Sequence, residues 1–236
     1  MGIVIGIDVG ISTTKIVGIK NNKIIRPIRI KATDPVTSLY GAFGKYINDN
    51  NLELSDVEHV MLTGVGSAYI KGPVYGLPTS KTDEFIADGL GAQYESNLNR
   101  MVVVSMGTGT TLVKYDNGEI SHIGGIGMGG GTLAGLSRLL LGTDDIKHVS
   151  KLAEAGNISH IDLHIGDICT EDIPGLPSYA TASLFGNAQS TASHEDIAIG
   201  IICTVVQTIG SAAILSSINS GIKDFVMIGN LTLLPQ

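Results

Sequence analysis

The stretch from Met101 to Leu136 constrains the fold of this chain more than any other part of the sequence. It starts with an apolar run, Met101 to Val104, which is typical of a buried strand and ends in the glycine turn at residues 107–110. Asp-Asn-Gly at residues 116–118 predicts a hairpin, because Asn-Gly readily takes the positive φ angles of a two-residue turn. A glycine-rich loop at residues 124–131 then leads into a helical pattern of apolar residues.

So many glycines in one segment indicate a requirement of the backbone conformation or of close approach to it. The chain has 31 glycines among its 236 residues, well above the ordinary share of about 7%. A loop without Cβ atoms lets another molecule approach its N–H groups, and a helix directly behind it adds a positive N-terminal end. This combination suits phosphate, whereas the alternative is a glycine turn used only for tight packing. A second turn of this type, Asp8 to Lys15, follows the first apolar strand and favours the phosphate interpretation.

Charge and cysteine content narrow the class of protein. The net charge of -7, without a cluster of Lys and Arg, argues against a nucleic-acid partner. Cys169 and Cys203 lack metal-ligand spacing and indicate reduced thiols in a cytoplasmic protein. The longest apolar stretch, Ile197 to Ile218, is interrupted by polar residues and glycine, so we expect a buried helix and no membrane partner.

The order of elements repeats along the chain. The first half predicts strands at residues 3–7, 16–20, 23–30, 57–62 and 74–78, a hairpin at Asn21-Asn22, and helices starting at Asp34-Pro35 and Thr82. The second half predicts helices at residues 132–141, 144–155 and 194–220 and a last strand at residues 225–228. We therefore expect two α/β domains, residues 1–99 and 100–236, facing a cleft with a phosphate turn in each.

At this point the sequence resembles a known family. The turns at Asp8-Val9-Gly10 and Gly107-Thr108-Gly109-Thr110 resemble those of the actin/Hsp70/sugar-kinase ATPase superfamily. That resemblance implies an α/β fold with two actin-like (ribonuclease H-like) domains around a nucleotide cleft. Three further pieces resemble type II pantothenate kinases: Glu84-Phe85 with Ala87-Asp88-Gly89-Leu90-Gly91, the loop at residues 124–131, and Ala182-Ser183-Leu184-Phe185-Gly186-Asn187.

The resemblance implies ATP-dependent phosphorylation of the primary hydroxyl of pantothenate, the first step towards coenzyme A, by a homodimer. Glu84 would be the catalytic base. Asp8 would hold Mg²⁺ through water, because this ion favours few protein carboxylates and keeps its water shell. The residues implied to bind the nucleotide are Asp8, Gly10, Lys15, Gly107, Thr108, Gly109, Thr110, Gly127, Gly129, Gly130 and Gly131.

Structural roles remain open for several of these side chains. Asp8 is also a residue type that caps a turn, and Lys15 is also consistent with a solvated charge. Glu84 stands at a helix start, where a carboxylate is favoured electrostatically. Thr108 and Thr110 are also consistent with ordinary strand residues.

The acceptor site departs from the family pattern. His122, Gly124 and Gly125 are expected to contact the substrate, but the family usually has an arginine where this chain has His122. Histidine is mostly neutral at pH 7 and lacks the bidentate guanidinium fork. The substrate is therefore expected to be pantothenate or a related small hydroxylated compound.

Two other functions remain open. The turn from Asp8 to Lys15 equally resembles that of 2-hydroxyacyl-CoA dehydratase activators, ATPases that hold an iron–sulfur cluster between two protomers; neither cysteine of this chain lies near the glycine-rich region. The family continues beyond Gln236 with a helical stretch, so we expect a shortened second domain with an apolar face for a partner chain. The third interpretation is a regulator that binds a nucleotide or acyl-CoA without catalysis.

Overall fold

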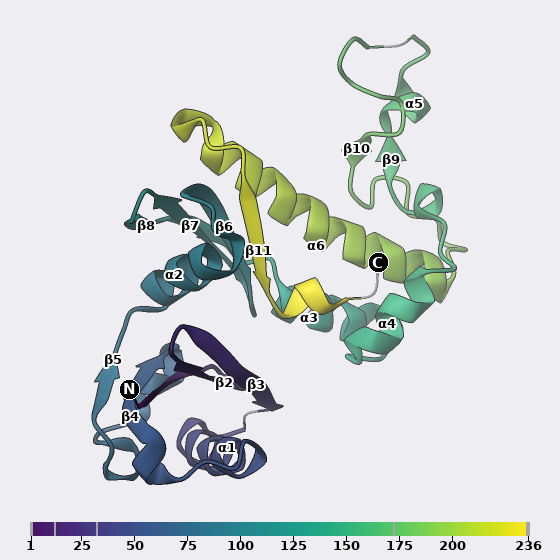
Figure 1. Cartoon of the computed structure of the whole chain (residues 1–236). Coiled ribbons are helices and arrows are strands. Elements are labelled where there is room, and N and C mark those ends of the chain that lie inside the picture. Colours follow the sequence, from purple (N-terminus) through teal and green to yellow (C-terminus); the bar gives the residue numbers. More distant parts are fainter. Residues whose placement is uncertain (1, 12, 32, 172, 235–236) are drawn as a thin grey trace. The chain divides into compact units, whose positions relative to one another are not determined.

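The computed structural model describes residues 2–11, 13–31, 33–171 and 173–234 (Figure 1). Ser12, in the first glycine turn, lies outside the described residues. The chain divides into two compact units, Met1–Leu90 and Gly91–Gln236. The expected domain division between residues 99 and 100 stays a prediction.

The first unit is built on a five-stranded sheet with the order β3-β2-β1-β4-β5. Antiparallel pairing joins β1 to β2 and β2 to β3, whereas β4 pairs parallel to β1 and β5 parallel to β4. Asn21 and Asn22 have φ angles of 51° and 59° and make the predicted hairpin between β2 and β3. The strands are β1 (Ile3–Val9), β2 (Thr13–Lys20), β3 (Lys23–Lys31), β4 (Val57–Thr63) and β5 (Thr79–Lys81).

The two faces of this sheet differ because strand side chains alternate. On β1, Ile3, Ile5, Ile7 and Val9 are buried in a core that includes apolar residues of helix α1 (Pro35–Asp49). The other side chains of β1 point to the opposite face. Asp8 is among them, so the alternation places a carboxylate outside the core at the end of the first strand.

Helix α1 begins where the sequence predicted it. The Oδ1 atom of Asp34 accepts a hydrogen bond from the amide of Thr37 at 2.7 Å, and Pro35 occupies the first turn.

The prediction of a strand at residues 74–78 is wrong. Val74–Gly76 forms a 3₁₀ turn in which Tyr75 has a φ of 52°, and β5 starts only at Thr79. The hydroxyl of Thr79 accepts from the amide of Val74 at 3.0 Å and donates to the carbonyl of Leu77 at 2.8 Å, which holds the turn closed. Helix α2 (Glu84–Ser96) follows, as expected.

The second unit repeats the first four strands of this arrangement. Its four-stranded sheet has the order β11-β6-β7-β8, with antiparallel pairing of β6, β7 and β8 and parallel pairing of β11 with β6. Asn117 and Gly118 form the predicted hairpin, with φ angles of 50° and 94°. The strands are β6 (Arg100–Met106), β7 (Thr110–Asp116), β8 (Glu119–Ile126) and β11 (Phe225–Gly229).

Helix α6 (His194–Ser217) is the core helix of the second unit. Its residues Ile201, Val205 and Ile209 are buried in one cluster with Val102 and Val104 of β6. With the short 3₁₀ turn that follows, it is the single described helix long and apolar enough to span a bilayer, but its buried face belongs to the protein core. The remaining elements are α3 (Gly130–Leu141), α4 (Ile146–Ala153), α5 (Ile165–Ile168) and the two-stranded sheet of β9 (Leu163–His164) and β10 (Thr181–Ser183).

Candidate active site

Asp8 stands where three strands of the first unit meet. In the sheet register it lies opposite Lys15 on β2 and opposite Thr63 on β4. Lys15 Nζ lies 2.8 Å from Oδ2 of Asp8, and both side chains are accessible to solvent. The predicted nucleotide residues Asp8 and Lys15 are therefore brought into direct contact. Gly10, which starts the turn between their strands, donates its amide to the carbonyl of Thr13 at 3.1 Å.

In each unit, a glycine lies at the end of the strand that pairs parallel to the first strand of the sheet, namely β4 and β11. Gly64 follows β4 with a φ of 81°, and a Cβ atom there would collide with Oδ1 of Asp8. Gly229 ends β11 with a φ of 103°, and a Cβ atom there would collide with the carbonyl oxygen of Met106. Only glycine takes such angles readily at a close approach. The two positions are equivalent in the repeated sheet order, and sequence reasoning missed both.

Glu84 is the first residue of α2. Desolvation by the surrounding protein, followed by the negative charges of Asp8 and Asp88, raises the pKa of the Glu84 carboxyl above its ordinary value. Lys15 acts in the opposite direction. The neighbouring Asp83 accepts a hydrogen bond from the amide of Phe85 at 2.8 Å and so serves the helix start. Glu84, Asp8 and Lys15 thus form one electrostatic group within the first unit.

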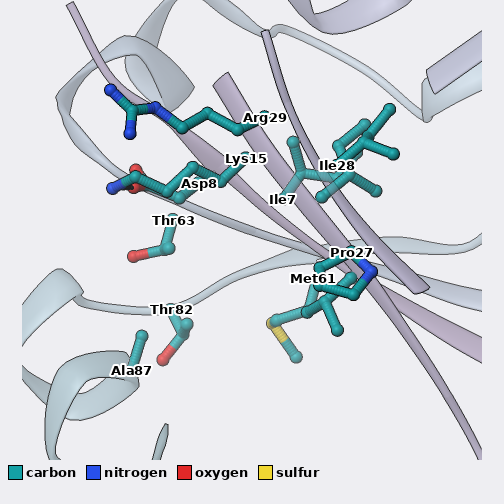
Figure 2. Close-up of a pocket in the computed structure, with 13 residues that line it drawn as sticks. Ile7, Asp8, Lys15, Pro27, Ile28, Arg29, Met61, Thr63, Thr82 and Ala87 are labelled. Carbon is teal, nitrogen blue, oxygen red and sulfur yellow. Dashed lines mark hydrogen bonds and ion pairs between the residues drawn. The ribbon is translucent and has the colours of Figure 1, made fainter. Parts of the chain in front are cut away.

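A pocket of about 420 Å³ opens on the face of the first sheet that carries Asp8. Figure 2 shows the side chains of Asp8, Lys15 and Arg29 lying next to one another, with Thr63 and Thr82 nearby and Pro27 and Met61 across the pocket. All of the lining residues belong to the first unit. Sequence reasoning missed the part played by Arg29, Thr63, Thr82 and Met61.

In the second unit, the glycine turn after β6 packs against the start of α3. The amides of Gly130 and Gly131 donate to the carbonyl oxygens of Gly107 and Thr108, each at 2.9 Å. Cβ atoms at Gly129 and Gly131 would clash with Thr108. These glycines therefore serve close packing, the alternative that the sequence left open, and the amides of Gly130 and Gly131 are already occupied.

The remaining groups of this turn face outward. Gly107 and Thr108 are exposed, and the amides of Thr108 and Gly109 make no hydrogen bond to another residue in the described ranges. Gly127 has open space around its Cα. Thr110, by contrast, is 3% exposed, and its buried hydroxyl has no hydrogen-bond partner within the described part of the chain.

The residues expected to contact the acceptor lie on β8 of the second unit. His122 is exposed and pairs in register with Val113, and Gly124 pairs with Leu112 across a register shift. Gly124 has a φ of 152°. Gly125 lies against the carbonyl of Thr110, to which a Cβ atom would approach within 2.9 Å.

Comparisons with known proteins show the family of this chain. The Fumble family model matches residues 67–233. A type II pantothenate kinase of Staphylococcus epidermidis is 31% identical over 219 residues, which cover 86% of this chain and 77% of that protein. A type II pantothenate kinase of Bacillus cereus is 27% identical over 236 residues, covering 96% of this chain and 83% of that protein.

Solved structures share the fold. The activator of the 2-hydroxyisocaproyl-CoA dehydratase from Clostridium difficile, with bound ADPNP, matches with a TM-score of 0.67 and 17% identity over 98% of this chain and 81% of that one. A ROK family protein from Streptococcus pneumoniae TIGR4 in complex with sucrose matches with a TM-score of 0.59 and 13% identity, covering 99% and 82%. At these identities the likeness concerns the fold alone, and it confirms the expected α/β fold with actin-like domains.

Proposed function

The chain belongs to the type II pantothenate kinase (Fumble) family, and we propose that it transfers the γ-phosphoryl group of ATP to the primary hydroxyl of pantothenate. This is the first step towards coenzyme A. The observation that carries the proposal is the group formed by Glu84, Asp8 and Lys15 in a chain whose relatives of this name match over most of its length. Phosphoryl transfer needs a carboxylate for the hydroxyl proton and neutralisation of phosphate charge, and these side chains offer both.

Glu84 is proposed as the catalytic base. The acceptor oxygen attacks the γ-phosphorus, its proton passes to the Glu84 carboxylate, and ADP leaves. A carboxylate whose pKa is raised accepts a proton more readily than an ordinary one. Desolvation and the charge of Asp8 raise the pKa of Glu84 in this direction.

Asp8 is proposed as the protein ligand of Mg²⁺, bound through water. Mg²⁺ usually takes one or two carboxylates, keeps several waters and binds phosphate oxygens, so a single accessible carboxylate fits it. No group of three or more His, Cys, Asp and Glu side chains is arranged to hold a metal within the described ranges. When bound, the ion would neutralise phosphate charge.

Lys15 is proposed to move from Asp8 to a phosphate oxygen of ATP. An ammonium on a flexible stem can exchange one anionic partner for another. Its ion pair with Asp8 is solvent-accessible, so breaking it costs about 1 kcal/mol or less. Gly10 would let the phosphate chain approach the turn between their strands.

In the second unit, the outward-facing part of the glycine turn is proposed to bind phosphate. The amides of Thr108 and Gly109 and the exposed hydroxyl of Thr108 are the donors in this turn. Gly127 leaves room for the nucleotide beside the backbone. Gly107, Gly129, Gly130 and Gly131 would support this surface by their packing, and Thr110 would support it as a buried strand residue. Contact of His122, Gly124 and Gly125 with the acceptor remains our prediction.

A cytoplasmic homodimer is proposed for the assembly. Helix α6 leaves Ile214 at 59% exposure, and Ile218, directly after the helix, is 64% exposed. The two residues are four positions apart and so lie on one face at the end of the helix. A second copy of the chain would cover this face without contact to the helix side that packs in the core.

The fold likeness to a dehydratase activator does not favour that function, because the match has 17% identity and concerns the fold. Product analysis distinguishes the proposed function from both alternatives. Incubation of the protein with ATP, Mg²⁺ and pantothenate should give phosphopantothenate and ADP in equal amounts by mass spectrometry. ATP hydrolysis that is independent of pantothenate, or ATP binding without turnover, would contradict the proposal.

A further inference from the structure

We propose that the pocket on the exposed face of the first sheet binds the acceptor and that Arg29 binds the carboxylate of that acceptor. This inference rests on the proposed function, because it takes pantothenate as the acceptor. It assigns a specificity-determining residue that lies on a different unit from His122.

Arg29 belongs to a row of charged residues across three strands. Asp8, Lys15 and Arg29 are consecutive partners in the register of β1, β2 and β3. Lys15 pairs with Asp8, whereas Arg29 is exposed and has no ion pair with any described residue. The row therefore offers an uncompensated guanidinium at the pocket wall. A guanidinium is the side chain best shaped to bind a carboxylate with two parallel hydrogen bonds.

A register shift between β2 and β3 brings Arg29 to this face. Near the hairpin, Lys20 pairs with Lys23 and Gly18 with Ile25, but after the shift Ile16 pairs with Ile28 and Lys15 with Arg29. Without the shift, Lys15 would lie opposite Ile28, and Arg29 would point to the opposite face of the sheet. The extra residue on β3 thus selects arginine in place of isoleucine for the pocket.

The rest of the lining suits a compact acceptor with an apolar body. Apolar or small residues form much of the wall, and the hydroxyl oxygen of Thr63 is buried without a hydrogen-bond partner among the described residues. Pantothenate has a branched apolar carbon next to its primary hydroxyl, further polar groups along its chain and a carboxylate at the far end. The small and apolar wall residues include Gly6, Val17, Pro27, Met61 and Ala87.

Residues next to Glu84 in the sequence also reach this pocket. Thr82 and Ala87, on either side of Glu84 in sequence, line the same pocket. A hydroxyl directed towards Glu84 is therefore compatible with a carboxylate at Arg29.

The test compares two acceptors that differ in charge. Pantothenol replaces the carboxylate of pantothenate by a neutral hydroxymethyl group and keeps the alcohol that is phosphorylated. In Arg29→Ala, the KM for pantothenate should rise by about 10- to 100-fold, as expected for a lost hydrogen-bonded charge pair. The KM for pantothenol and the KM for ATP should stay within about twofold of wild type, since neither depends on a carboxylate at this position. Arg29→Lys should recover part of the pantothenate affinity, because it keeps the charge without the fork.

Arg26→Ala is the matched control. Arg26 is an exposed arginine on the same strand that does not line the pocket, so its removal should leave both KM values unchanged. Thermal melting of each variant checks that it is folded. Equal losses with pantothenate and pantothenol, a change confined to the KM for ATP, or no change in Arg29→Ala would each overturn the inference.

Binding separates this inference from the proposed function. Calorimetric titration of pantothenate into the ATP-analogue complex should show binding to wild type and a matching loss in Arg29→Ala. If the wild-type protein turned over neither acceptor, the proposed function would fail, and the titration would still decide the role of Arg29. Pantothenate binding that is equal in wild type and Arg29→Ala would contradict the inference in either case.

Discussion

Lys15 forms an ion pair with Asp8, with 2.8 Å between Nζ of the lysine and Oδ2 of the aspartate. The two residues face each other in the register of β1 and β2, so the sheet itself holds them together. A cation that binds through Asp8 must compete with this ammonium. The resting partner of Asp8 and the proposed ligand of phosphate are thus the same side chain.

Asp8→Asn should weaken the Mg²⁺-dependent step. The amide keeps the size of the side chain but removes the negative charge that attracts both Lys15 and the ion. Initial rates measured against Mg²⁺ concentration should show a higher requirement for Mg²⁺ and a kcat lower by about 10²-fold or more. An unchanged rate at limiting Mg²⁺ would refute the assignment.

Glu84→Gln should stabilise the fold at neutral pH while it removes the base. The pKa of Glu84 is raised in the folded protein, so the folded state binds its proton more tightly than the unfolded chain does. Stability from this group is therefore present at low pH and lost as the pH rises through the raised pKa. The variant should melt at a higher temperature than wild type at pH 7, because it removes the desolvated charge and relieves the repulsion with Asp8 and Asp88.

The pH dependence supplies the control for this prediction. Below the ordinary pKa of a glutamate, both wild-type Glu84 and glutamine are neutral, so the difference in melting temperature should shrink there. A stabilisation that is the same at pH 7 and at low pH would show that the charge of Glu84 is not its cause.

Gly64→Ala should destabilise the first unit. The φ of 81° and the collision with Asp8 leave no room for a methyl group, and such backbone strain costs about 1–3 kcal/mol. Gly72→Ala is the matched control, since Gly72 has open space and no positive φ. Urea unfolding should separate the two variants. Equal stability of both would contradict the close approach at Asp8.

Gly127→Ala and Gly131→Ala should separate nucleotide binding from packing. Gly127 has open space, so alanine there should leave unfolding unchanged and lower ATP affinity if the nucleotide lies against the backbone. Gly131 lies against Thr108, so alanine should lower the stability of the second unit. Calorimetric ATP titration and urea unfolding of both variants test this. Unchanged ATP affinity in Gly127→Ala would remove Gly127 from the proposed site.

Local signals in the sequence predicted much of the fold. Asn21-Asn22 and Asn117-Gly118 identify their hairpins because few residue types take two positive φ angles in succession. Asp34-Pro35 identifies the start of α1 by capping chemistry. The sequence indicates the similarity of the two units only through the repeated order of their strands and helices.

The site was harder to predict, because it depends on register and packing. Hairpin pairing without a shift would place Ile28 opposite Lys15, so no sequence pattern indicated that Arg29 lies at the pocket. The glycines at 129–131 look identical to phosphate-binding glycines in sequence, but two of their amides are used by the neighbouring turn. The roles of Gly64 and Gly229 depend on the close approach of residues from another strand, which the sequence does not show.

The most direct test of the central claim is the rate of ADP release with ATP, Mg²⁺ and pantothenate, measured for wild type and Glu84→Gln together with their ATP affinities. We predict pantothenate-dependent turnover in wild type, a loss of about 10²- to 10⁴-fold in the variant, as for removal of a general base, and nearly equal ATP affinities. Turnover in Glu84→Gln equal to that of wild type would contradict the assignment of the base. The absence of pantothenate-dependent turnover in a wild-type protein that binds ATP would contradict the kinase function itself.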